Sequence, residues 1–309
     1  MRKLAPALGL MSLLLPTASV AQETVFRVDV RLVRILATVK NSAGELVGHL
    51  NKEDFEIYDN GVKQEIAIFE RRTEQPLSVA LLVDTSASTA IELRYELDSV
   101  SRFLKAVFAE GNPEDSVALY SFNYEVTLLS GFTSRRLGLE QALKMLQPVG
   151  GTSLYDAIYL ASKNLESREG RRVMILVTDG GDTTSSKTFH DALEAAQLAD
   201  AVLYSILVMP ITSDAGRNIG GENALATLAA GTGGRVFTPS VGASLDTAFL
   251  DILRELRTQF FLGFYPKNVP PSTERFHQLR VKVLRPDLRA LARSGYYGEV
   301  DRKSGPGSQ

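Results

Sequence analysis

The apolar run Leu81–Val83 ends in side chains that carry oxygen. The run is typical of a buried strand, and Asp84, Ser86 and Ser88 follow it in one short loop. Ligands of open α/β sheets gather beyond the carboxyl ends of the strands, and hard oxygen donors suit a small divalent cation such as Mg²⁺. The pattern has a second explanation when it stands alone, because Ser and Asp also cap the N-termini of helices.

Two later stretches bring further oxygen donors to the same edge of the expected sheet. A pair of glycines leads into a helix and leaves the hydroxyl of Thr152 at its start. Val173–Val177 is typical of another buried strand, and Asp179 follows it. Because the carboxyl ends of parallel strands lie at one edge of a sheet, we expect Asp179 near Asp84.

Taken together and in this order, these residues resemble the von Willebrand factor type A (VWFA) domain. Its metal-ion-dependent adhesion site combines Asp-x-Ser-x-Ser, a loop threonine and a later Asp at a strand end. The resemblance implies direct metal ligation by Ser86, Ser88 and Thr152. Asp84 and Asp179 would then hold the ion mostly through water molecules. The implied ion is Mg²⁺, with Mn²⁺ or Ca²⁺ as alternatives.

The charges of such a site favour a ligand that brings its own carboxylate. Two ionised aspartates formally balance a divalent cation, while neutral hydroxyls leave the cation electrophilic toward one more oxygen. The resemblance implies that an Asp or Glu of a protein partner supplies this oxygen. Asp182, Gly151 and Gly180 are candidates to lie around the ligands, and Asp182 is also explained as a solvated turn residue.

The elements that must position these residues follow a change of pattern along the chain. From Pro76 to about Ala248, short apolar runs alternate with segments of helical periodicity, which is typical of a mainly parallel sheet covered on both faces. We expect a doubly wound, Rossmann-like α/β domain, and the resemblance covers roughly Leu77–Phe237 of it. The expected strands are Val79–Val83, Val117–Phe122, Val173–Val177 and Val202–Val208, and the expected helices are Ile91–Ala109, Leu137–Leu146, Leu154–Leu165, Phe189–Leu198 and Leu245–Leu256.

Strand-like segments flank this α/β domain (76–248). Residues 22–75 hold about four of them, with a hairpin signal at Asn60-Gly61, and residues 249–300 hold the end of the last helix and about three strands. Since about seven short strands make a minimal sandwich, we predict one β-sandwich built from both segments, with the α/β domain inserted in it or flanked by it. Two separate small sheets are the alternative. These flanks are similar to those of the exported VWFA-related domain proteins described mainly from acidobacteria.

The N-terminus has the pattern of a secretory signal. Arg2-Lys3 precedes the apolar stretch Leu4–Leu15, and small residues follow. The stretch is shorter than the roughly 20 residues that a membrane span needs. We therefore interpret residues 1–21 as a signal peptide and expect an exported protein, periplasmic or extracellular, without an integral membrane segment after cleavage. Residues 301–309 are expected to be a disordered tail.

Composition limits the chemistry that is open to the chain. The 309 residues include no cysteine, which excludes disulfides, thiolate zinc sites and cysteine nucleophiles. With 34 Lys+Arg against 36 Asp+Glu, the formal charge of −2 gives no general attraction to nucleic acids. No nucleic-acid partner is expected.

Catalytic patterns fit less well than a binding site. Phosphatases that resemble haloacid dehalogenases carry the motif Asp-x-Asp-x-Thr after a strand. In this chain Ser86 and Ser88 replace the second Asp and the Thr of that motif. The histidines fall in three different regions, and arginine pairs such as Arg171-Arg172 are interpreted as solvated ends of elements. The polar loop Met209–Gly221 is a candidate specificity loop.

The sequence thus favours a non-enzymatic, exported binding module that uses Mg²⁺ to bind an acidic group of another protein. One alternative is a structural envelope component in which the ion only stabilises the loops. A metal-dependent hydrolase is less favoured, because no set of catalytic bases accompanies the oxygen ligands.

Overall fold

The fold is described from a computed structural model, which describes residues 32–71, 75–90, 93–208, 218–239, 243–270 and 275–298. The expected signal peptide and the expected C-terminal tail lie outside these residues. Within the described ranges, no helix has the length and apolar character needed to cross a membrane.

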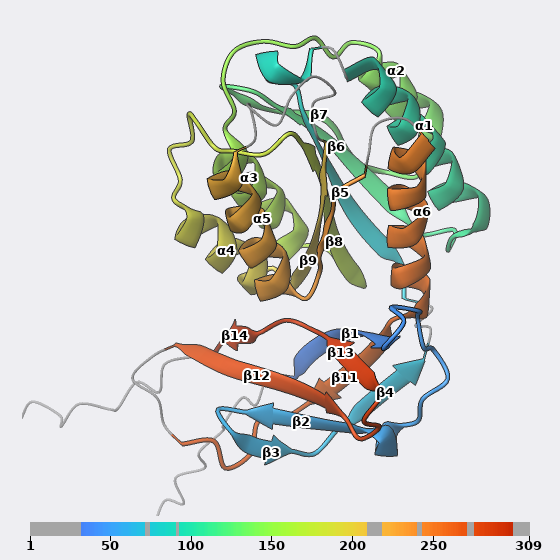
Figure 1. The fold of residues 1–309 in the computed structure, drawn as a ribbon, viewed down its shortest axis with the longest axis vertical. Helices are drawn as coiled ribbons and strands as arrows, with labels where there is room; N and C mark the ends of the chain where they lie inside the picture. Colours follow the sequence, from blue (N-terminus) through green and yellow to red (C-terminus); the bar gives the residue numbers. More distant parts are fainter. Residues whose placement is uncertain are drawn as a thin grey trace, which may run out of the picture. The chain divides into compact units, whose positions relative to one another are not determined.

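A six-stranded sheet forms the centre of the α/β domain (Figure 1). Its strand order is β10-β9-β8-β5-β6-β7, and every neighbouring pair is parallel except β6 and β7. The mainly parallel sheet expected from the sequence is therefore confirmed. The strands are β5 (Leu77–Asp84), β6 (Ser116–Phe122), β7 (Val126–Thr133), β8 (Arg171–Thr178), β9 (Ala201–Leu207) and β10 (Val236–Phe237).

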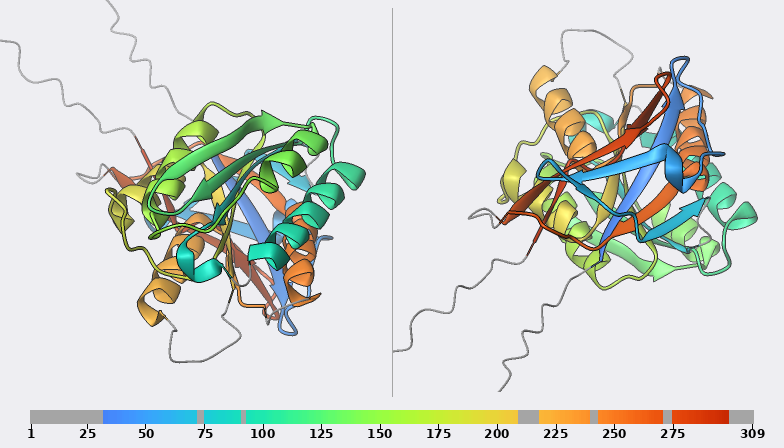
Figure 2. Two further views of the ribbon diagram at one scale, coloured as in Figure 1. Left: turned by 90° about the horizontal axis from the view of Figure 1, so that it is seen from above. Right: turned by 90° about the horizontal axis from the view of Figure 1, so that it is seen from below.

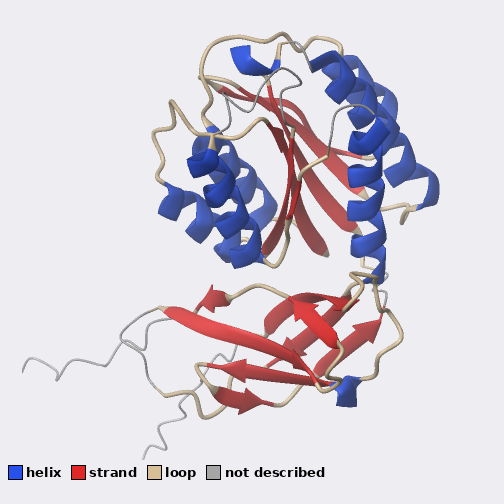
Figure 3. Cartoon of the chain, viewed as in Figure 1, coloured by secondary structure: helices blue, strands red, loops and turns tan. Residues whose placement is uncertain are grey.

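Helices cover both faces of this sheet (Figure 3). One face carries α1 (Leu93–Glu110), α2 (Arg136–Leu143) and α6 (Ala243–Thr258), and the other carries α3 (Leu154–Glu166), α4 (Phe189–Leu198) and α5 (Ile219–Thr232). Every residue of β5 is buried as a result, which explains why its sequence is continuously apolar from Val79 to Val83, between Ser78 and the terminal Asp84.

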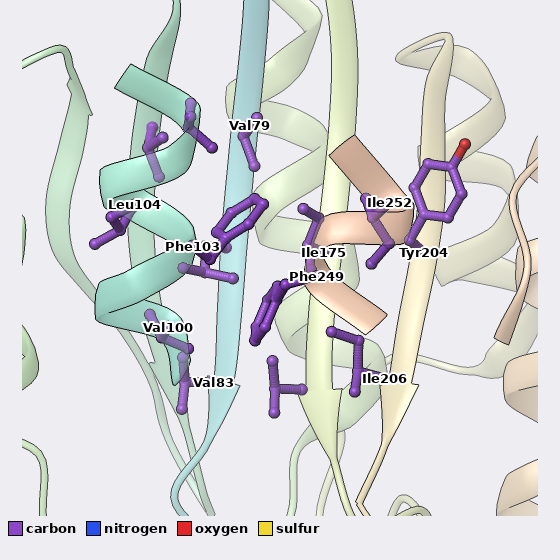
Figure 4. Close-up of a cluster of buried hydrophobic side chains, with 14 of the residues drawn as sticks. Val79, Val83, Val100, Phe103, Leu104, Ile175, Tyr204, Ile206, Phe249 and Ile252 are labelled. Carbon is purple, nitrogen blue, oxygen red and sulfur yellow. The ribbon is translucent and has the colours of Figure 1, made fainter. Parts of the chain in front are cut away.

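Helix α6 packs on α1 over the sheet (Figure 4). The rings of Phe103 and Phe249 stack there with centroids 4.7 Å apart, and Ile252 is fully buried one turn further on. Residues 249–258, which the sequence analysis places with the C-terminal segment, are thus a continuous part of a helix that belongs to the α/β core. The reason is the apolar face of α6, which runs through position 248 without interruption and has to be covered.

The N- and C-terminal segments form two four-stranded antiparallel sheets, ordered β13-β1-β11-β4 and β14-β12-β2-β3. One hydrophobic cluster draws on both sheets and includes Ile35, Phe55, Phe260 and Leu279. The segments thus share one core, as predicted, with eight strands. In Figure 2, right, β1 is blue and lies beside C-terminal strands in orange and red. The strands are β1 (Val33–Asn41), β2 (Phe55–Asp59), β3 (Val62–Gln64), β4 (Ile68–Arg71), β11 (Phe260–Phe264), β12 (Phe276–Val283), β13 (Leu288–Leu291) and β14 (Gly295–Tyr297).

Local turn chemistry explains some of these strands and not others. Asn60 and Gly61 have φ angles of 46° and 82°, as the expected tight hairpin between β2 and β3 requires. The segment 62–69 after this turn divides between β3 and β4, which lie in different sheets. Strand β7 is absent from the expected elements, because it contains Gly131 and pairs with β6 through register shifts that break a regular alternation.

Glu255 of α6 is buried and makes ion pairs with one residue of the β segments and one of the α/β domain. It is 2% exposed, and its carboxylate accepts hydrogen bonds from Lys40 of β1 and from Arg235, each at 2.6 Å. Replacing it with alanine would leave two cations without their partner. We expect Glu255→Ala to lower the free energy of unfolding by about 3 kcal/mol.

The measurement is urea-induced unfolding of the full chain. The matched control is Asp251→Ala on the same helix. The ion pair of Asp251 with Arg254 is exposed and is expected to contribute less than about 1 kcal/mol to the free energy of unfolding. Equal losses for the two variants would contradict this role of Glu255.

Candidate functional site

The site begins at the carboxyl end of β5, at the upper edge of the sheet in Figure 1. Asp84 is the last residue of this central strand and is completely buried. The hydroxyl of Thr178, at the end of β8, donates a hydrogen bond to its Oδ2 at 2.6 Å, and the backbone N–H of Ser86 donates to its Oδ1 at 2.8 Å. Both carboxylate oxygens are therefore fixed in direction.

Two serine hydroxyls follow Asp84 in the same loop. The Oγ atoms of Ser86 and Ser88 lie 3.0 Å apart, which is close enough for both to contact one small ion. Ser86 is buried and Ser88 is exposed, so the pair leads from the protein interior to solvent. The loop is held in shape by Thr89, whose hydroxyl donates to the backbone oxygen of Ser86 at 2.9 Å.

The loop that carries Thr152 is attached to the Asp84 loop by backbone hydrogen bonds. The N–H of Val149 donates to Thr85 O at 2.8 Å, and the N–H of Ala87 donates to Gly150 O at 3.1 Å. Gly150 has a φ of 68° and lies against the ring of Tyr124, where a Cβ would come within 2.5 Å of the ring. This position requires glycine for both reasons.

Thr152 itself is 5% exposed and stands just before α3. Its backbone N–H donates to the hydroxyl of Thr183 at 2.8 Å, and its backbone oxygen accepts from the N–H of Thr183 at 2.8 Å. The side-chain hydroxyl of Thr152 makes no hydrogen bond within the described ranges. It is therefore available to a ligand.

Asp179 follows β8 directly and is half-buried. It lies close enough to Asp84 for its negative charge to act on that carboxyl group. Gly180 next to it has a φ of 132°, which only glycine adopts without strain, and its N–H donates to the Thr178 hydroxyl at 3.2 Å. The chain can thus turn sharply and leave the Asp179 side chain at the sheet edge.

The remaining candidates shape the loops around these residues. Asp182 accepts hydrogen bonds from the N–H of Tyr155, at 3.3 Å, and from the hydroxyl of Ser185, so it joins its loop to the start of α3. A Cβ on Gly151 would lie 2.7 Å from the Cγ2 of Thr184, which explains the need for glycine at this close approach.

Electrostatics at Asp84 favour a cation. The pKa of Asp84 is raised to about 6 overall, because burial, the largest effect, and the negative charge of Asp179 outweigh the lowering by hydrogen bonds from Thr178 and Ser86. No salt bridge compensates Asp84 within the part of the chain that the structure describes. The ionised carboxylate of Asp84 therefore has no positive partner among the described residues.

The donor set fits a hard divalent cation. It offers two carboxylates and three hydroxyls, all oxygen, which suit Mg²⁺ and leave positions for water. No group of three or more His, Cys, Asp and Glu that could hold a metal occurs among the described residues, so any site here depends on the hydroxyls of Ser86, Ser88 and Thr152.

Sequence reasoning missed two contributors. Thr178 precedes Asp179, and only the alternation of side chains along β8 could have indicated that its hydroxyl points toward Asp84. Asn218 caps α5 by accepting from the N–H of Gly221 at 2.9 Å, and a Cβ on Gly181 would lie 1.8 Å from its Nδ2. This end of the expected specificity loop therefore contacts the loop after Asp179, while residues 209–217 lie outside the described residues.

A family model described as von Willebrand factor type A domain matches residues 79–181, about a third of the chain. This range contains all five candidate ligands. Among curated proteins, none matches the sequence.

Three solved structures are similar to the chain at low identity. The vWF domain of the type V pili tip protein Mfa5 from Porphyromonas gingivalis is 17% identical, with 58% of this chain and 94% of that chain covered and a TM-score of 0.48. BatB from Bacteroides thetaiotaomicron is 19% identical over 58% of this chain and 98% of that chain, with a TM-score of 0.46. Proximal thread matrix protein 1 from the mussel byssus is 18% identical over 70% of this chain and 48% of that chain, with a TM-score of 0.49. On the family match, the chain contains a von Willebrand factor type A domain at residues 79–181.

Proposed function

We propose that the type A domain binds one divalent cation, Mg²⁺ with Mn²⁺ or Ca²⁺ as alternatives, and through it an acidic group of a protein partner. The observation that supports this most directly is Asp84, a buried carboxyl group with both oxygens fixed and no cation paired with it among the described residues. The hydroxyls of Ser86, Ser88 and Thr152 are the direct ligands in this proposal. Asp84 and Asp179 balance the charge and hold bound water.

A carboxylate partner follows from the exposure and charge of the ligands. Ser88 is exposed and Asp179 is half-buried, so one side of the cation would face solvent. The two aspartates compensate the 2+ charge only at a distance if neutral hydroxyls occupy the inner sphere. An Asp or Glu of the partner is then the ligand that gains most from the remaining position.

We also propose that the protein is exported and acts in the periplasm or outside the cell. The support is the sequence of residues 1–21 alone, with its basic start and short apolar stretch.

An exported binding module has no need of catalytic groups. Of the three histidines, His277 lies on β12 of the sandwich and contacts Asp59, far along the chain from the site loops.

A purely structural role for the ion has less support. The loops of Thr85 and Gly150 are already closed by backbone hydrogen bonds, and Thr152 is tied to Thr183 in the same way. An ion is therefore not needed to bring these loops together, although it would relieve the repulsion between Asp84 and Asp179.

The metal site is tested by calorimetric titration of Mg²⁺ and Mn²⁺ into metal-stripped protein. We expect one ion per chain, and at least roughly tenfold weaker binding in Asp84→Ala and in Thr152→Val, which replaces the hydroxyl with a methyl group of similar size. Asp98→Ala, which deletes an exposed carboxylate on α1, is the control and should bind like the wild type. Unaltered affinity in both site variants would contradict the proposed ligand set.

Metal binding should depend on pH through Asp84. Because burial raises its pKa to about 6, Mg²⁺ must displace a proton at lower pH, and its affinity should fall roughly tenfold per pH unit below that value. In metal-free protein, a pKa raised from 3.8 makes the fold most stable while Asp84 is protonated, and stability should fall as pH rises from 3.8 to about 6.

Chemical unfolding across this pH range measures the second effect, with Asp84→Asn as the comparison. The variant should lack the fall in stability. If it retained the full pH dependence, another group would be responsible.

The partner chemistry is tested with paired peptides that differ only by Asp against Asn or Glu against Gln. Binding should require both the carboxylate and Mg²⁺, because the carboxylate completes the coordination of the cation. A peptide library screened with Mg²⁺ and then with a chelator provides the measurement. Capture that persists in the chelator, or that is equal for the amides, would refute metal-mediated recognition while leaving the metal site itself to the titration above.

A further inference from the structure

A cavity of about 30 Å³ lies at the amino ends of β8 and β9, at the opposite end of these strands from the Asp84 site. Four arginines line it: Arg34, Arg171, Arg172 and Arg293. The sequence analysis interprets Arg171-Arg172 as a solvated end of an element. This is wrong for Arg171, which is only 6% exposed because the chain between β4 and β5 and the end of α6 cover it.

The cavity has an excess of positive charge. Asp200 is the only acidic residue among those that line it, and Arg293 pairs with it through Nη1. Burial lowers the pKa of Arg172, the charge of Asp200 raises it, and the nearby charge of Arg34 lowers it. Glu166 also raises the pKa of Arg172 and Asp115 raises that of Arg171, but among the described residues that line the cavity itself four arginines face one carboxylate.

Backbone carbonyl groups hold the guanidinium groups in place. Arg171 donates to Gln75 O at 3.1 Å and also to Leu256 O. Arg172 donates to Arg168 O at 2.7 Å and to Ala199 O at 2.8 Å. These contacts fix the direction of each guanidinium group and use only part of its five N–H donors.

One donor is left over inside the protein. Arg293 is 8% exposed, its Nη2 donates to Arg34 O at 2.5 Å, and its Nε is buried without a hydrogen-bond partner in the part of the chain that the structure describes. A buried charged donor without a partner is costly, and such groups are normally satisfied by water or by a ligand. This orphan donor belongs to a residue of the same cavity wall.

We propose that this cavity is a binding site for a small oxyanion, a phosphate, sulfate or carboxylate group. Guanidinium groups bind such groups through paired N–H donors, and an anion would compensate the charges of Arg34 and Arg172. A volume of about 30 Å³ accommodates the oxygen-bearing end of a small ligand rather than a large molecule. The site is separate from the proposed metal site, and neither depends on the other.

Binding at this position would couple two parts of the fold. Arg34 comes from β1, Arg293 follows β13, and Arg172 belongs to β8 of the central sheet. An oxyanion held by all three would stabilise the folded chain in proportion to its occupancy. Its effect should therefore appear in thermal unfolding as well as in a binding measurement.

The test titrates inorganic phosphate, sulfate and acetate in separate arms into metal-free full-length protein. Ionic strength is held constant with chloride, and a chelator excludes binding through a metal. We expect saturable binding of one anion per chain and a rise in Tm in at least one arm. The anion that binds with the highest affinity identifies the chemical class of the ligand.

Variants locate the site. Arg34→Gln and Arg172→Gln should each weaken binding at least roughly tenfold, whereas Arg289→Gln, an exposed arginine on β13 outside the cavity, should bind like the wild type. Arg34→Lys keeps the charge but not the paired donors. Its affinity for the anion should therefore lie between that of Arg34→Gln and that of the wild type. Because Arg34 is exposed, its variants remain informative if Arg172→Gln does not fold.

No saturable binding in any arm would overturn the proposal. Equal affinity in the Arg34, Arg172 and Arg289 variants would overturn it as well, since the anion would then be bound elsewhere.

Discussion

The burial of Asp84 at the end of the central strand is the constraint on which the rest of the site depends. A carboxyl group in the protein interior is costly when ionised unless hydrogen bonds and opposite charge compensate it. Thr178 and Ser86 supply the hydrogen bonds, while the charge of Asp179, which also acts on Asp84, is negative. The described residues supply no ion pair to Asp84, so compensation has to come from a bound cation or from a proton.

The parallel sheet makes this arrangement possible and also limits it. Adjacent β5 and β8 end at the same edge, so Asp84, Thr178 and Asp179 come together without any long-range adjustment. The backbone hydrogen bonds of the 149–153 loop then bring Thr152 to the same edge. The site is therefore built on rigid strand ends and closed loops, which favours a preorganised ligand set.

Much of this could be predicted because its signals are local. A continuous apolar run indicates a strand covered on both faces, and the residues directly after it indicate what stands at its carboxyl end, as with Asp84 and Asp179. The Asn60-Gly61 hairpin is local in the same sense, because its φ angles suit these two residue types.

What the sequence did not indicate depends on contacts between distant segments. The inward direction of the Thr178 hydroxyl follows from strand pairing, and the burial of Arg171 follows from carbonyl groups at Gln75 and Leu256, on either side of it in the chain. The helix over Leu245–Leu256 is expected from the sequence, but its packing on α1, where Phe103 covers Phe249, likewise joins distant segments. Local sequence patterns do not indicate these partners.

Anomalous diffraction from crystals of the protein soaked in Mn²⁺ tests the central claim most directly, because it locates the ion without reference to any variant. The account predicts one strong anomalous peak within coordination distance of the hydroxyls of Ser86, Ser88 and Thr152, with Asp84 and Asp179 beyond it. The absence of a peak at this position at millimolar Mn²⁺, or a peak elsewhere in the chain alone, would contradict it.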